Sequence, residues 1–186
     1  VQRFDSRSGV AVVVSHLPTP RADSAAVVIG RTAYIVGGYD GHSWRTDVLA
    51  TRDGVRFRVV AQLPIGVRYP ALAVYGPWIN VFGGETPSGA ITDVQRINVE
   101  TGTTKVVAQL PQPRAHANAV VLDGAIDVAG GGSTSILRFD PIACTFRTVG
   151  TMPVDVHDAG AATVRTTALV LGGENPDRSP AIYALR

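Results

Sequence analysis

The sequence has one cysteine, one lysine, one methionine and no long apolar run. Because Cys144 stands alone, the chain can form neither an internal disulfide nor a cysteine-based metal site. No stretch approaches eighteen consecutive apolar residues and the first residues do not resemble a signal peptide, so we expect no membrane insertion. The chain starts at Val1 rather than Met, and we expect a preceding segment to have been removed.

Arginine supplies almost all of the positive charge, with Lys105 as the only lysine, and the formal net charge is +2. The arginines are spread along the chain, which argues against a nucleic-acid surface. The pair Arg56 and Arg58 alternates with apolar residues, as at a solvated strand edge. Arginine in place of lysine, with abundant alanine and valine, suggests a GC-rich bacterial source.

Helical periodicity is also missing, and apolar runs end instead at pairs of glycines. Four such pairs occur: Gly37–Gly38, Gly83–Gly84, Gly130–Gly131 and Gly172–Gly173. A Leu-Pro or Met-Pro pair begins twenty residues before each of them, and successive pairs are 46, 47 and 42 residues apart. This period is typical of propellers and repeat arrays.

Each repeat divides into short strands. A stretch of small and β-branched residues, such as "SAAVVIG", is followed by a tight turn and by the strand that ends at the glycine pair. A third strand ("DVLAT", "VQRINV", "ILRFD"), a hairpin such as Asp53-Gly54, and a fourth strand such as "FRVVAQLP" complete the unit. Asp-Gly supplies the positive-φ positions that short hairpins need, and the pattern predicts an all-β chain.

The repeats resemble kelch repeats, the four-stranded antiparallel blades of a β-propeller. The resemblance rests on the glycine pair, on "LP-x-PR" in "LPTPR" and "LPQPR", and on the Phe-Asp of "RFD". The tyrosine of the pattern is present as Tyr34 but is replaced by Asn80, Asp127 and Leu169, and its fourth-strand tryptophan is missing. The resemblance covers the whole chain and implies an all-β propeller of about four blades.

The expected domain is a single propeller over residues 1–186, divided at the Leu-Pro and Met-Pro pairs, which we call the repeat markers. Whole blades are expected at 17–62, 63–109 and 110–151, a half-blade at 1–16, and a last blade without its fourth strand at 152–186. Two arrangements follow. The chain either closes a four-bladed ring with one redundant strand, or is part of a larger ring completed by further sequence or by a second chain. We favour the second.

The loop that leads into the first strand of a blade and the loop that leaves the second strand emerge on one face, at the mouth of the central channel. Loops there commonly carry function. The candidate ligand-binding residues are Arg21, Asp23, Trp44, Arg68, Tyr69, Arg114, His116, His157 and Asp158. They would suit a small polar or anionic ligand or a protein partner. For any single arginine, however, a structural role between blades is the first expectation.

Three functions are compatible with this pattern. A non-catalytic ligand- or protein-binding module comes first, since kelch propellers commonly serve recognition. The second is a carbohydrate-active enzyme of mutarotase or lyase type, with His116, His157 and Asp158 as acid–base candidates, because the kelch family includes a sialic acid mutarotase. The third is a structural or assembly domain.

A non-catalytic protein without cofactor or metal is favoured. The copper chemistry of galactose oxidase, another kelch enzyme, is discounted because no Tyr-His pair occurs. Cys144 falls in a hairpin away from the expected site and is expected to be an incidental thiol. The family habit and the missing N-terminus suggest an extracytoplasmic protein.

Overall fold

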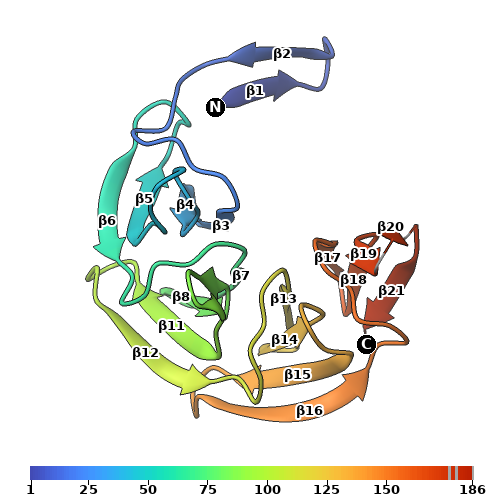
Figure 1. Ribbon diagram of the computed structural model, residues 1–186. Coiled ribbons are helices and arrows are strands. Elements are labelled where there is room, and N and C mark those ends of the chain that lie inside the picture. The colour runs from blue at the N-terminus through green and yellow to red at the C-terminus, as the bar shows by residue number, and fades with distance from the viewer. Residues whose placement is uncertain (176, 179, 186) are drawn as a thin grey trace.

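The computed structural model describes residues 1–175, 177–178 and 180–185, and all regular elements within these ranges are β-strands. None of the described residues belongs to a helix that could cross a membrane. The sheets follow one another around an open arc, from a hairpin at the N-terminus to a sheet at the C-terminus (Figure 1). The expected all-β propeller architecture is confirmed.

Three four-stranded antiparallel sheets and one three-stranded sheet form four blades, each running outward from an inner strand. The first blade contains β3 (Ala25–Ile29), β4 (Thr32–Val36), β5 (Asp47–Thr51) and β6 (Arg58–Gln62). The second contains β7 (Ala71–Tyr75), β8 (Trp78–Phe82), β11 (Asp93–Asn98) and β12 (Thr104–Gln109). The third contains β13 (Asn118–Leu122), β14 (Ala125–Ala129), β15 (Ser135–Asp140) and β16 (Thr145–Thr151). The fourth contains β17 (Gly160–Val164), β18 (Thr167–Leu171) and β21 (Ile182–Leu185).

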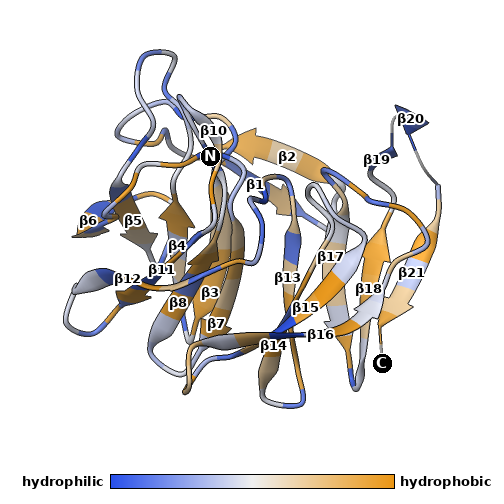
Figure 2. Cartoon of the chain, turned by 60° about the horizontal axis from the view of Figure 1, so that its bottom comes forward, coloured by the Kyte–Doolittle hydropathy of each residue, from blue (hydrophilic) through white to orange (hydrophobic). Residues whose placement is uncertain are grey.

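Three short hairpins complete the described chain. One consists of β1 (Gln2–Asp5) and β2 (Val10–Val13), and two lie in loops that leave second strands: β9 (Glu85–Thr86) with β10 (Gly89–Ala90), and β19 (Glu174–Asn175) with β20 (Asp177–Arg178). The inner strands β3, β7, β13 and β17 are neighbours in that order. Figure 2 shows the apolar residues along the strands and polar residues in many of the connecting loops.

The hydrophobic core lies between blades rather than inside a single sheet. Val48 and Ile79 belong to one cluster that joins the first and second blades, and Phe82 and Phe139 belong to a second cluster that joins the second and third. The rings of Phe82 and Phe139 meet edge to face, with centroids 5.3 Å apart. Because each blade buries its apolar face against the next, adjacent blades stabilise one another.

The glycine pairs mark the closest approach of neighbouring blades. Gly83 has φ +56°, and a Cβ atom there would overlap the carbonyl oxygen of Arg114 in the loop before the next blade. The following residue, Gly84, donates its N–H to that same carbonyl at 2.8 Å. A side chain at Gly83 would therefore separate two blades, and glycine is required for architecture.

The replacements of the kelch tyrosine are compensated on the facing strand. In the first blade Tyr34 lies opposite Ala50. In the second blade Asn80 lies opposite Arg96 and accepts a 2.8 Å hydrogen bond from its Nε. The first blade thus has a large residue opposite a small one, and the second blade has a hydrogen-bonded polar pair at the same place. Both arrangements fill the space between the second and third strands.

The described chain has free strand edges at both ends of the arc. The strand β1 pairs only with β2, and β21 is the outer strand of its sheet. All residues of β1 and β2 are exposed, including Phe4 and Val13. Such edges offer unpaired backbone groups to another strand.

Candidate functional site

The loops between blades and the loops after second strands meet on one face of the arc, which we call the rim. Single β-bridges join them in three blades: Ala22 with Tyr39, Arg68 with Glu85, and His157 with Glu174. Each bridge fixes one loop against the other, so side chains from both loops are presented together.

Four residues occupy the same place in successive blades, five positions after the proline of the repeat marker. They are Asp23, Tyr69, His116 and Asp158, and all have left-handed backbone conformations, with φ of 59°, 52°, 62° and 52°. Each of the last three donates its N–H to the carbonyl of the one before, at 2.8, 3.0 and 3.3 Å in chain order. The backbone thus links the four blades at the rim, and uncommon non-glycine conformations gather there.

Two of the expected ligand-binding arginines are buried instead, two positions earlier in the loop. Arg21 has a fully buried side chain, and its Nη2 donates to Asp47 at 2.6 Å. Arg114 is 1% exposed and donates to the carbonyls of Gly130 and Ser135 at 2.8 and 2.9 Å. Both arginines connect the end of a second strand to the start of a third, and neither can contact a ligand at the surface.

Burial and pairing shift the pKa values of these inner groups. Burial opposes ionisation of Asp47, but hydrogen bonds from Arg21 and Arg45 outweigh it and hold the pKa of Asp47 below its usual value. Burial lowers the pKa of Arg114, whose charge is compensated mainly by carbonyl oxygens, with Asp155 acting in the opposite direction. These groups belong to the scaffold of the rim.

Arg68 lies at the surface of the rim, surrounded by carboxylates and rings. Its Nε and Nη2 both donate to one oxygen of Glu85, at 3.0 and 2.5 Å. The pKa of Arg68 is raised, chiefly by this pairing. Its guanidinium carbon lies 5.9, 5.7 and 5.2 Å from the ring centroids of Tyr39, Trp44 and Tyr69. These distances are those of cation–π contacts.

The two histidines of the rim are each oriented by a carboxylate. His116 stacks on Tyr69, with centroids 3.8 Å apart, and its Nδ1 lies 2.7 Å from Asp158. His157 Nε2 lies 3.0 Å from a carboxylate oxygen of Asp155, and the two imidazole rings are 6.0 Å apart. The contacts therefore run continuously from the aromatic residues of the first blade to the fourth.

Carboxylates outnumber arginines on this surface. The acidic side chains are Asp23, Asp40, Glu85, Asp155, Asp158 and Glu174, whereas the arginines of the same loops with solvent-accessible side chains include Arg45, Arg68 and Arg178. Burial raises the pKa of the Tyr69 phenol, as does neighbouring Asp23. A cavity of about 330 Å³ beside His157 is lined by Asp155, Glu174 and Asn175. The rim therefore presents more carboxylates than accessible arginines, although several of the candidate residues expected from the sequence are arginines.

The rim thus brings together Asp23, Arg68, Tyr69, His116, His157 and Asp158 of the candidate residues. Trp44 is half-buried and packs against Tyr39, so it also supports the neighbouring loop. Sequence reasoning missed Asp155, although its position two residues before His157 is a usable signal. Across the described residues, no group of three or more His, Cys, Asp or Glu side chains is arranged to hold a metal ion.

Curated proteins with kelch-like names resemble this sequence along most of its length. Kelch-like protein terF of Aspergillus terreus is 28% identical over 162 residues, which cover 79% of this chain and 34% of the relative. Kelch-like protein 35 of Mus musculus is 25% identical over 177 residues, covering 94% of this chain and 31% of the relative. This chain is a kelch-repeat β-propeller. No protein-family model matches the sequence.

The kelch chain spans about a third of the length of both relatives. Both come from eukaryotes, a fungus and a mouse, so the comparisons give no support to the expected bacterial and extracytoplasmic origin.

Proposed function

We propose that this kelch chain is a non-catalytic module that binds a protein partner at the rim. The observation that carries the proposal is the convergence of Asp23, Tyr69, His116 and Asp158 from four blades, joined by backbone hydrogen bonds. A surface assembled from successive blades, held rigid by the backbone and rich in aromatic and charged groups, has the composition of a recognition site.

The chemistry of the rim favours a cationic segment of the partner. Glu85 and Asp158 offer acceptors for lysine or arginine, and charge-assisted hydrogen bonds are the stronger ones. Arg68 illustrates the fit, since the chain's own guanidinium is held there by three rings and a carboxylate. A partner's arginine would find the same kinds of groups at the exposed side of the cluster.

A peptide titration tests this proposal. Fluorescein-labelled hexa-arginine and hexaglutamine peptides would be titrated with the purified chain and followed by fluorescence anisotropy. We expect hexa-arginine to bind more tightly. We also expect Glu85→Gln combined with Asp158→Asn to weaken that binding about tenfold or more, in keeping with loss of charged acceptors. Glu100→Gln is the matched control, because Glu100 is exposed in the turn after β11 at the opposite end of the blade.

Equal affinity for both peptides would contradict the proposal. So would a double variant that binds hexa-arginine as the unmodified chain does.

One observation favours a second candidate function, an enzyme acting on a carbohydrate-like substrate. The 2.7 Å contact of His116 with Asp158 orients an imidazole as acid–base groups are oriented in active sites. In this case the rate of sugar mutarotation or elimination would depend on pH and would fall at least about a hundredfold in His116→Gln. A pH–rate profile unchanged by loss of both His116 and His157 would exclude this role.

The free edges of β1 and β21 favour association with further blades. We propose that these edges are completed by additional kelch sequence or by a second copy of the chain, within a structural assembly. Sedimentation at several concentrations tests the second-copy form of the proposal. A stable dimer would support it, and a monodisperse monomer at all concentrations would contradict it.

A further inference from the structure

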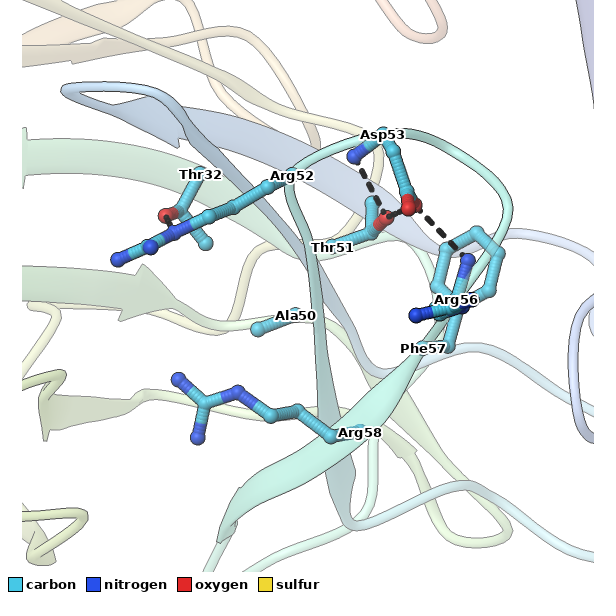
Figure 3. Close-up of a pocket in the computed structure, with 8 residues that line it drawn as sticks. All are labelled: Thr32, Ala50, Thr51, Arg52, Asp53, Arg56, Phe57 and Arg58. Carbon is cyan, nitrogen blue, oxygen red and sulfur yellow. Dashed lines mark hydrogen bonds between the residues drawn. The ribbon is translucent and has the colours of Figure 1, made fainter.

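A second recessed site lies on the first blade, at the end opposite the rim. It is a cavity of about 340 Å³ formed where β4 begins, β5 ends and β6 begins. Its lining includes Thr32, Ala50, Arg52, Asp53, Arg56 and Arg58 (Figure 3). Three of these residues are exposed arginines, and we call the cavity the arginine pocket.

The arginine pocket differs from its counterpart in the third blade in charge. A cavity of the same volume, about 340 Å³, lies at the equivalent place of the third blade, but Asp140 stands there where the first blade has Arg52. Ala50 lies between Tyr34 on β4 and Arg58 on β6. In the second and third blades the corresponding residues are Arg96 and Arg138, which fill this position and donate hydrogen bonds within the protein. In the first blade Tyr34 and the small Ala50 occupy this place, and the exposed Arg52 and Arg58 have no such carboxylate or amide partner among the described residues.

The arginines around Ala50 are only weakly engaged by the protein. Arg52 Nε donates to the Thr32 hydroxyl at 3.3 Å, which positions its guanidinium and leaves both of its Nη groups for other acceptors. Within the described chain, the side chain of Arg58 has no hydrogen bond or ion pair. Figure 3 shows the guanidinium groups of Arg52 and Arg58 extending in the same direction, on either side of Ala50.

Asp53 supplies one negative charge against the three arginines of the pocket. Its carboxylate is occupied by the N–H groups of Arg56 and Val55, each at 2.8 Å, and these bonds lower the pKa of Asp53. The charge of Arg56 lies close enough to act on it as well. The lowered pKa keeps Asp53 ionised, so its charge offsets one of the three arginines, and the pocket retains a net positive charge. An adjoining cavity shares Thr32 and Arg52 and adds Arg31, which extends the positive surface.

We propose that the arginine pocket binds an oxyanion, a phosphoryl or carboxylate group, carried by an acidic segment of a protein partner. Guanidinium groups on both sides of a small residue can each donate to such a group, and arginine binds it through parallel hydrogen bonds. The site is separate from the acidic rim, so the two ends of the first blade would select segments of opposite charge.

Three probes distinguish the source of the oxyanion: inorganic phosphate, a phosphoserine hexapeptide and a hexaglutamate peptide. Each would be titrated against the full chain by isothermal calorimetry at low salt. We expect at least one peptide to bind, and we expect Arg52→Ala with Arg58→Ala to weaken its binding about tenfold or more. Lys105→Ala is the matched control because Lys105 has the position of Arg58 in the second blade, on the facing strand to Arg96. It should bind as the unmodified chain does.

A second variant tests the charge of the pocket. Arg52→Asp would place in the first blade the residue that the third blade has at the equivalent position, Asp140, and we expect it to abolish binding of the peptide while the chain stays folded by circular dichroism. The proposal is overturned if neither peptide binds, if the double variant binds as the unmodified chain, or if Lys105→Ala is equally weakened. It is also overturned if a DNA oligonucleotide of equal charge binds more tightly than the peptides. Binding by phosphate alone would likewise reduce the site to an adventitious ion site.

Discussion

The guanidinium of Arg138 donates two hydrogen bonds, each of 2.7 Å, to the carboxylate of Asp127 on the adjacent strand. The Asp127 side chain is 2% exposed and that of Arg138 is 22% exposed, so the pair joins a buried acid to a partly exposed base. It occupies the place of Tyr34 and Ala50 in the first blade. An ionic pair can thus replace an aromatic contact in a kelch blade when both strands change together.

This asymmetry predicts unequal effects of removing either partner. Arg138→Ala leaves a buried carboxylate unpaired and should lower the free energy of unfolding by about 3 kcal/mol or more. Asp127→Ala leaves a guanidinium that can reach water and should cost less. Urea unfolding of both variants measures the difference, with exposed Arg147→Ala as the control. An equal loss in the two variants would contradict the explanation.

Two glycines allow the stability cost of a strained backbone conformation to be separated from the cost of a clash between blades. Gly76 and Gly83 have the same φ of +56°, but a Cβ atom at Gly76 would meet nothing within 4 Å, whereas at Gly83 it would overlap the backbone of Arg114. Gly76→Ala should cost about 1–3 kcal/mol for the strained conformation alone. Gly83→Ala should cost clearly more. Thermal unfolding of the two variants would refute the blade-contact argument if their midpoints were the same.

Asp47 predicts a loss of stability in acid. Because its pKa is lowered in the folded protein, its contribution is complete above the unfolded value of about 3.9 and is lost as pH falls through the folded pKa. Unfolding free energies measured from about pH 6 down to pH 3 should fall more steeply for the unmodified chain than for Asp47→Asn. Glu100→Gln should follow the unmodified chain. Parallel curves for Asp47→Asn and the unmodified chain would show that this carboxylate does not contribute.

Replacing Arg114 should lower the stability of the chain without weakening its binding of a ligand at the rim. Arg114→Val introduces the residue found at the equivalent buried positions Val67 and Val156. It removes the donors to Gly130 and Ser135 and should cost about 2–4 kcal/mol. Binding of hexa-arginine by the folded variant should be unchanged. If the folded variant bound hexa-arginine more weakly than the unmodified chain, Arg114 would have to be part of the ligand-binding surface.

Most of the architecture could be predicted from sequence because it repeats. The spacing from each Leu-Pro or Met-Pro pair to its glycine pair recurs, and small turns such as Asp53-Gly54 separate the strands. Alternation along single strands was less informative, since β5 is buried throughout between blades. Periodicity within one strand cannot reveal a second packing surface, whereas a recurring spacing identifies the blade directly.

The residues of the rim could be predicted only in part, because neighbouring side chains within one short loop differ in burial. Arg21 and Asp23 belong to the same short loop, yet the side chain of Arg21 is fully buried and Asp23 faces the rim. Sequence places both at the channel mouth but does not give the left-handed turn at Asp23 that separates their directions. The number of arginines that reach the surface of the rim depends on this separation, which the sequence does not reveal.

The links from Asp23 through Tyr69 and His116 to Asp158 use only main-chain atoms. Substitution at these positions can therefore change the side chains at the rim while the main-chain hydrogen bonds between blades keep their donors and acceptors. Side chains as different as a carboxylate, a phenol and an imidazole already occupy this position in successive blades. Partner choice can consequently change during evolution one blade at a time, independently of the geometry that holds the repeats in register.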